Sequence, residues 1–259
     1  MSWEAFWFKR QNLIIGLGTV IAFFLIWEAI FAWFVPLNTF VMSTPNLIFK
    51  GWGIEIASGQ LLNDLKISGK PFLFGFGSAA VIGIFMGTMM GWRARVGYSL
   101  DPLLTALYAS PLIAVAPLMI IAFGVGVAGK AILVFILCVF PFIFNTYAGV
   151  KAVEQLLVDV VRSLGGTQLD IYFKVIVPSV LPFIIAGARY AIGRALVGIL
   201  VGEFYAATAG IGFRIAFYSD MYELSRMFAY IFTMMVIAVV FTEGIRWAER
   251  TAFPWRIGM

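Results

Sequence analysis

The residues with the clearest chemical potential are two arginines, Arg189 and Arg194, inside a long apolar segment. A charge at the centre of a bilayer costs about 2.5–3.5 kcal/mol even on the mildest scale, so each must face protein, water, a lipid headgroup or an anion. At about 100° per residue the two side chains point about 140° apart around a helix. Glu203 and Glu28 are the candidate counter-ions. Structural ion pairing and an anion-attracting translocation path therefore remain alternatives, with Arg189, Arg194 and Glu203 as the candidate path residues.

Several kinds of chemistry are excluded by residue types that the sequence lacks. It has no His, which removes histidine acid–base catalysis, Ser-His-Asp triads and most zinc sites. The phosphate-binding pattern G-x4-G-K-[ST] is also absent. The single cysteine, Cys138, cannot form an intrachain disulfide. We therefore predict a chain that is not an enzyme and that holds no metal or cofactor.

The composition predicts an all-α polytopic membrane protein. Hydrophobic residues make up 62% of the chain and charged residues 12%, with a mean hydropathy of +0.98, whereas soluble domains have about 25% charged residues. A spanning helix needs about 20 apolar residues. Six segments qualify: Leu13–Phe34, Phe72–Gly91, Leu103–Phe123, Ala131–Val150, Pro178–Gly202 and Phe228–Arg246. Pro111 and Pro117 are expected to kink or break the third segment.

The basic residues predict the orientation in the membrane. With the N-terminus in the cytoplasm, ten of them fall inside, namely Lys9, Arg10, Arg93, Arg95, Lys151, Arg162, Lys174, Arg246, Arg250 and Arg256. Six fall outside, namely Lys50, Lys66, Lys70, Lys130, Arg214 and Arg226. Six spans then return the C-terminus to the cytoplasm. The net charge of +5 thus indicates topology rather than nucleic-acid binding.

The outer loops and the small residues give further expectations. The loop Val35–Pro71 is expected to hold a short helix around Asn46–Ala57, and Leu61–Ser68 to start the second span early. The loop Glu203–Arg226 is expected to form a re-entrant or interfacial cap. Small residues recur at helical spacing: Ala79, Gly83, Gly87 and Gly91, then Gly187, Ala191 and Ala195, then Gly198 and Gly202. Such stripes allow close helix packing, either within one subunit or at a dimer interface or gate.

One polar island between two apolar blocks carries a recognisable pattern. The stretch Asp159–Pro178 reads DVVRSLGGTQLDIYFKVIVP. Gly165 stands four positions beyond Val161, and Pro178 closes the island. This order resembles the E-A-A-x3-G-x9-I-x-L-P loop of ABC importer permeases, with Asp for Glu and Val for the small and apolar positions. An ordinary amphipathic loop is the plain alternative.

The resemblance to these permeases extends from about Ser43 to Arg256. Four short motifs follow in the order of the nitrate, sulfonate and taurine branch, namely Tyr108-Ala109-Ser110-Pro111, Ala116-Pro117-Leu118, Gly202-Glu203 and Ala209-Gly210-Ile211-Gly212. It implies the type I importer permease fold, one permease domain over residues 1–259 and a coupling loop at about 151–178. The coupling residues would be Asp159, Gly165, Gly166, Asp170 and Pro178. Arg189 is the favoured path arginine, since its position also matches the family pattern.

The resemblance further implies an assembly in the bacterial inner membrane. It would contain two permeases, identical or paralogous, two cytoplasmic ATPases that hold the ATP and magnesium, and an external substrate-binding protein. The expected cargo is a small anion such as a sulfonate or nitrate, with a vitamin-like or aromatic compound as the alternative. An ion-driven secondary transporter would not need the Asp159–Pro178 loop, and an intramembrane enzyme lacks suitable residues.

Overall fold

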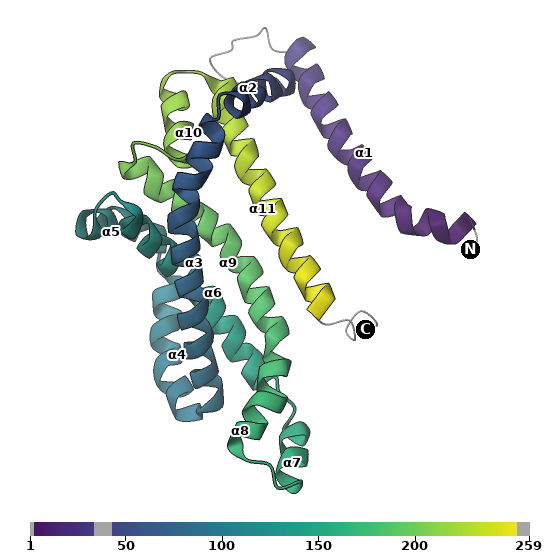
Figure 1. Ribbon diagram of the computed structural model, residues 1–259, viewed down its shortest axis with the longest axis vertical. Coiled ribbons are helices and arrows are strands. Elements are labelled where there is room, and N and C mark those ends of the chain that lie inside the picture. Colours follow the sequence, from purple (N-terminus) through teal and green to yellow (C-terminus); the bar gives the residue numbers. More distant parts are fainter. Residues whose placement is uncertain (1–2, 34–42, 253–259) are drawn as a thin grey trace. The chain divides into compact units, whose positions relative to one another are not determined.

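The computed structural model describes residues Trp3–Trp33 and Ser43–Ala252, and every regular element in these ranges is helical (Figure 1). The elements are α1 (Trp3–Trp33), α2 (Pro45–Ala57), α3 (Gln60–Trp92), α4 (Ala94–Ala109), the 3₁₀ turn η1 (Leu112–Val115), α5 (Ala116–Phe123), α6 (Val127–Lys151), α7 (Gln155–Ser163), α8 (Gln168–Ile171), the π-helical turn η2 (Tyr172–Ile176), α9 (Val177–Ala206), α10 (Ile211–Asp220) and α11 (Leu224–Ala252).

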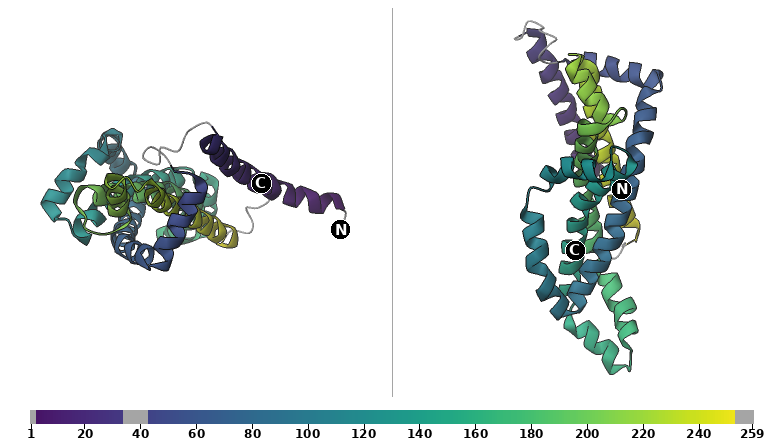
Figure 2. Two further views of the ribbon diagram at one scale, coloured as in Figure 1. Left: turned by 90° about the horizontal axis from the view of Figure 1, so that it is seen from above. Right: turned by 90° about the vertical axis from the view of Figure 1, so that its left-hand side faces the viewer.

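The number of spans agrees with the sequence. Within the described ranges, five helical segments are long and apolar enough to cross a membrane, and there are six if the bent pair α4 and η1–α5 counts as one span. The two helices of the pair are bent by 80° at a break that contains Ser110 and Pro111. The right-hand view of Figure 2 shows the change in direction of the ribbon there. Pro111 cannot continue a helix because its ring occupies the space of a preceding carbonyl. Pro117 lies in the first turn of α5, where proline is tolerated, so only one of the two expected prolines breaks the span.

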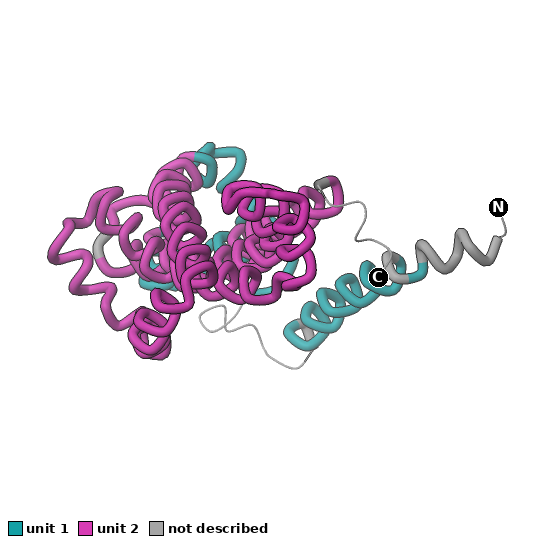
Figure 3. Tube along the Cα trace, turned by 90° about the horizontal axis from the view of Figure 1, so that it is seen from below, with its two compact units in different colours: residues 1–62, 214–232 teal, residues 63–213, 233–259 magenta. Residues whose placement is uncertain are grey.

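The chain divides into two compact units, coloured separately in Figure 3. Unit 1 comprises residues 1–62 and 214–232, and unit 2 comprises residues 63–213 and 233–259. The expected single permease domain stays a prediction. Phe34, the loop residues up to Met42 and Arg256, which the sequence argument uses, lie outside the described residues.

Unit 1 is organised around a buried carboxylate on α2. Glu55 is 3% exposed and accepts hydrogen bonds from the Tyr218 hydroxyl at 2.7 Å and the Tyr230 hydroxyl at 3.1 Å. Arg226 Nε lies 3.6 Å from the same carboxylate. Burial, reinforced by Glu55, raises the pKa of Tyr218, so its hydroxyl remains a donor. The short helix expected around Asn46–Ala57 is confirmed as α2, and the loop expected to form a cap contains the helix α10. Glu55 links α2 to Tyr218 of α10, whereas the interfacial or re-entrant placement of α10 stays a prediction.

Glu28, one of the two candidate counter-ions, caps a helix in unit 1. Its carboxylate accepts a hydrogen bond from the backbone N–H of Asn46 at 3.0 Å. Asn46 lies in the first turn of α2, whose N-cap is Thr44. A negative charge is stabilising beside the free N–H groups of a helix start. The described contacts of Glu28 thus account for its charge without an arginine.

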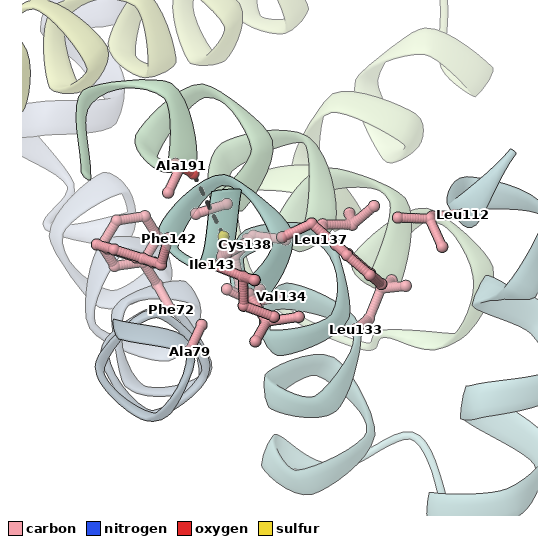
Figure 4. Close-up of a cluster of buried hydrophobic side chains, with 14 of the residues drawn as sticks. Phe72, Ala79, Leu112, Leu133, Val134, Leu137, Cys138, Phe142, Ile143 and Ala191 are labelled. Atoms are coloured by element: carbon pink, nitrogen blue, oxygen red, sulfur yellow. Dashed lines mark hydrogen bonds between the residues drawn. The ribbon is translucent and has the colours of Figure 1, made fainter. Parts of the chain in front are cut away.

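Unit 2 is built around α6, the most buried of the spans. Its core contains Leu133, Leu137, Cys138, Phe142 and Ile143, which pack between α3 and α9 (Figure 4). The Cys138 thiol donates to the carbonyl of Ala191 at 3.3 Å. A helix that is apolar on all sides suits such a central position.

Glycines allow α3 and α9 to approach α6 closely. A Cβ on Gly83 would lie 2.5 Å from Phe142 Cβ, and one on Gly87 would lie 2.5 Å from the carbonyl of Ile143. On the α9 side, a Cβ on Gly187 would lie 3.1 Å from Asn145 Cβ. Ala191 and Ala195 are fully buried. The small-residue stripes therefore serve packing inside unit 2, which was the plainer of the two alternatives.

Candidate functional site

The polar island forms a helical hairpin, α7 and α8–η2, of which α7 has no buried residue. Val158 and Val161 of α7 pack partly against a small cluster, whereas its other apolar side chains are exposed. Leu156, Leu157 and Val160 are 70%, 45% and 49% exposed, and Leu164, which caps the helix, is 83% exposed. We call these four residues the α7 ridge. Their spacing puts them on about 100° of one face, so the ridge is an apolar surface with no cover in this chain's described part.

The turn after α7 requires glycine at one position and disfavours any side chain at the next. Gly165 has φ +77, in the left-handed region. Its N–H donates to the Arg162 carbonyl at 3.0 Å, and the Gly166 N–H donates to the Val161 carbonyl at 2.9 Å. These two bonds are the Schellman pattern that ends a helix. A Cβ on Gly166 would lie 2.5 Å from Val161 Cγ1.

The second helix of the hairpin begins with a complete capping box. The Asp170 N–H donates to Thr167 Oγ1 at 3.3 Å, and the Thr167 N–H donates to Asp170 Oδ2 at 2.9 Å. Lys174 Nζ lies 2.6 Å from the other oxygen of Asp170. Asp170 is therefore a structural residue of the hairpin. Pro178 occupies the first turn of α9, where a missing N–H costs little.

Asp159 lies on the exposed side of α7 away from the ridge. Its carboxylate accepts from Gln155 Nε2 at 3.0 Å and lies 3.4 Å from Arg162 Nη1. The Asp159 side chain is 55% exposed, so this ion pair contributes little stability. The Asp159 carboxylate is thus paired with its helix neighbours and still accessible to solvent.

The hairpin is attached to the spans through aromatic and apolar contacts. Trp92, at the end of α3, stacks on Tyr172 of η2 with ring centroids 4.7 Å apart. Ile171, Ile176 and Val180 form a buried cluster with Val150 of α6. A displacement of the hairpin would therefore be transmitted directly to α3, α6 and α9.

The two arginines of α9 have different surroundings. Arg189 Nη2 lies 2.7 Å from Glu249 Oε2 on α11. Arg194 is exposed, and its guanidinium lies 5.6 Å from the centre of the Tyr108 ring on α4. The counter-ion of Arg189 is thus Glu249, and neither Glu203 nor Glu28, which the sequence suggested, fills that role. Glu249 was missed because it lies 60 residues away in sequence.

Glu203 belongs to a buried network near the end of α9. It is 1% exposed, and Lys130 Nζ lies 3.3 Å from its Oε1. The Ser68 hydroxyl donates to the same carboxylate at 2.9 Å and the Gly212 N–H at 2.8 Å. Asp64, fully buried, accepts from the Gly210 N–H at 3.1 Å. This network fixes the backbone that leads into α10. Lys130, expected in an outer loop, is a buried member of α6.

Among the described residues, no group of His, Cys, Asp and Glu is placed to hold a metal ion. The five expected coupling residues lie together in the hairpin or at its junction with α9. The three candidate path residues share α9 but not a common set of contacts. The α7 ridge was not singled out from the sequence, although its spacing in positions 156, 160 and 164 was visible there.

The chain was compared with known protein families and curated proteins. A family model described as "Binding-protein-dependent transport system inner membrane component" matches residues 79–252. The putative aliphatic sulfonates transport permease protein SsuC of Bacillus subtilis is 32% identical over 248 residues, covering 96% of this chain and 90% of the relative.

Two further relatives carry other substrate names. The taurine transport system permease protein TauC of Escherichia coli is 28% identical, covering 98% of this chain and 94% of the relative. The formylaminopyrimidine transport permease protein ThiX of Halalkalibacterium halodurans is 30% identical, covering 78% of this chain and 81% of the relative.

Proposed function

The chain belongs to the family of binding-protein-dependent transport system inner membrane components, the permease subunits of ABC importers, and from this premise we propose that it carries a small organic oxyanion into the cytoplasm. The proposed cargo class is an alkyl sulfonate such as taurine. The names of two relatives, for aliphatic sulfonates and for taurine, support this class. On α9, Arg189 is paired with Glu249, whereas Arg194 lies over the Tyr108 ring and keeps its charge. An arginine of this second kind suits an anionic cargo.

We propose that the α7–α8 hairpin docks on a cytoplasmic ATPase. The observation that carries this proposal is the α7 ridge, an exposed apolar surface on a segment that the spans hold firmly. Exposed apolar patches with polar surroundings are typical of protein interaction sites. ATP and magnesium would be bound by two such ATPases rather than by this chain. Gly165, Gly166, Asp170 and Pro178 shape the hairpin or its junction with α9. Asp159 lies on the exposed side of α7 away from the ridge.

The remaining parts of the assembly follow from the same premise. A second permease, identical or paralogous, would complete the path, and an external binding protein would deliver the cargo to the outer side. Both termini would lie in the cytoplasm, as the basic residues favour. The name of the ThiX relative makes a vitamin precursor the alternative cargo.

The docking proposal is tested with two aspartate substitutions on α7 in the complex co-expressed with its ATPase and binding protein. Val160→Asp places a charge on the ridge and should reduce ATPase co-purification at least tenfold, with a parallel loss of labelled taurine uptake. Gln155→Asp, on the polar face of the same helix, is the control and should leave both near wild type. Equal retention of the ATPase by the two variants would contradict docking at the ridge.

Uptake by the wild-type complex tests the cargo separately. Labelled taurine, an alkyl sulfonate and a pyrimidine vitamin precursor would each be supplied with the cognate binding protein. Preferential uptake of the sulfonates would support the proposed class. Uptake of the pyrimidine alone would support the alternative and leave the coupling proposal intact.

A further inference from the structure

The two sides of α9 differ sharply in their surroundings. Ala191, Ala195 and Ile199 are buried against the core of unit 2. Tyr190, Gly193, Arg194 and Val197 follow one another at helical spacing on the other side, and all four are exposed. We call these four residues the open face of α9. Because α9 is a candidate span, the surroundings of this face in the membrane must accommodate an arginine.

Lipid acyl chains would leave the charge of Arg194 on the open face unsolvated. Arg194 lies near the middle of α9, and among the described residues no carboxylate forms an ion pair with it. A charged group at that depth normally faces protein, a water-filled cavity or a ligand. Arg189 faces protein, since Glu249 on α11 lies 2.7 Å away and neutralises its charge. Arg194 has no such carboxylate partner within the described part of the chain.

Tyr108 holds the Arg194 guanidinium without neutralising it. The guanidinium lies 5.6 Å from the centre of the Tyr108 ring, within the range of cation–π attraction. Tyr108 is itself stacked on Phe140 with centroids 5.5 Å apart. This aromatic contact restricts the arginine while its charge and its N–H donors remain available. The planar donor fork of arginine matches the oxygens of a carboxylate or sulfonate.

The site also has space and lies beside an irregular backbone segment. A Cβ on Gly193 would meet nothing within 4 Å. Tyr108 is the penultimate residue of α4, directly before the break at Ser110 and Pro111. Non-helical backbone at membrane depth is tolerated where it is buried in protein or lines a water-filled cavity. The helix break at Ser110 and Pro111 lies close to Arg194, which has no carboxylate partner among the described residues. Both features favour the open face of α9 as the side that lines the solute path.

We propose that Arg194, positioned by Tyr108, is an oxyanion-binding residue of the translocation path, and that Arg189 is a structural residue. The ligand class is a small monoanion with two or three equivalent oxygens, such as an alkyl sulfonate. This proposal rests on the importer function proposed above. Binding at Arg194 is transient, because a path must release the solute that it attracts.

The central test replaces each arginine by glutamine in the complete transporter. Arg194→Gln should reduce sulfonate uptake at least tenfold, while complex assembly and basal ATPase activity stay within twofold of wild type. Arg194→Lys retains the charge but not the fork and should give intermediate uptake. Arg189→Gln is the matched control and should instead lower the yield or melting temperature of the complex. Unchanged uptake in Arg194→Gln, or failed assembly of both Arg194 variants, would overturn the proposal.

A labelling experiment tests whether water and the anion reach this position. Arg194→Cys should react with a cationic methanethiosulfonate reagent, which restores a positive charge at this position and with it part of the sulfonate uptake. An anionic reagent of similar size should not restore uptake. The wild-type chain is the labelling control, since Cys138 is fully buried. If Arg194→Cys does not react, the open face does not line a water-filled path and the proposal fails. If the wild-type complex transports no sulfonate at all, the proposed cargo is wrong.

Discussion

At the scale of single residues, the charges on the helices of this protein are compensated in different ways. Glu203 has a cation, a hydroxyl and a backbone N–H around it, which is the full complement that a buried carboxylate needs. Glu55 has two phenols and a partly exposed arginine. Among the described residues, the exposed Arg194 guanidinium lies over the aromatic ring of Tyr108. Ionisable residues inside a membrane span commonly mark substrate or ion pathways.

Gly210 is a residue at which the Glu203 network predicts a strong effect. Its φ is +116, and a Cβ there would overlap the Glu203 carboxylate. Overpacking of this kind costs about 1–3 kcal/mol. We expect Gly210→Ala to lower the melting temperature of the purified complex by roughly 2–12 °C. Gly77→Ala, where a Cβ would meet nothing within 4 Å, is the control, and an equal shift in both variants would rule out the carboxylate as the cause.

At the scale of elements, the hairpin between α6 and α9 combines a rigid frame with an exposed surface. Its frame consists of the Schellman turn at Gly165 and the capping box of Thr167 and Asp170. The family resemblance singled out Gly165, and the structure places it in the left-handed conformation that ends α7. The sequence did not predict which apolar side chains of α7 would be exposed. Val158 and Val161 are partly covered because α7 packs on the cluster at Val150, and the ridge residues are left exposed by the same packing.

The left-handed conformation of Gly165 provides a test of the hairpin's role in coupling. A branched or long side chain at φ +77 is strained by about 1–2 kcal/mol, so Gly165→Leu should distort the turn. We expect basal ATPase activity to persist and stimulation by the binding protein to fall several-fold, together with uptake. Gly165→Asn is the matched control, since asparagine tolerates this conformation. Full stimulation and uptake in Gly165→Leu would argue against a coupling role.

At the scale of the whole molecule, the spans and the basic residues define a topology that can be tested directly. The described residues contain five apolar helices and one bent pair of sufficient length. If the bent pair is one span, the even number of spans places both termini on one side, and the charge bias favours the cytoplasm for that side, which stays a prediction.

Impermeant maleimide labelling of intact cells checks this orientation. Ser219 in α10 and Ser99 in α4 are both exposed, and the topology puts them on opposite sides of the membrane. Ser219→Cys should be labelled in intact cells, and Ser99→Cys only after permeabilisation. The wild type should remain unlabelled in both, because Cys138 is buried. The reverse pattern would invert the topology and move the hairpin away from any cytoplasmic ATPase.

The sequence by itself determined the helical class, the apolar segments able to span a membrane, the polar island between two of them and the family resemblance, because hydropathy, proline position and glycine spacing act locally along the chain. Only the tertiary structure decided which charges are neutralised. Arg189 meets Glu249, and Glu203 meets Lys130, through helix contacts that no local pattern specifies. The sequence favoured Arg189 as the path residue, whereas the packing of α9 leaves Arg194 as the arginine without a carboxylate among the described residues. Ion pairing depends on which helix faces meet, and that is set by the whole core rather than by the neighbours of either arginine.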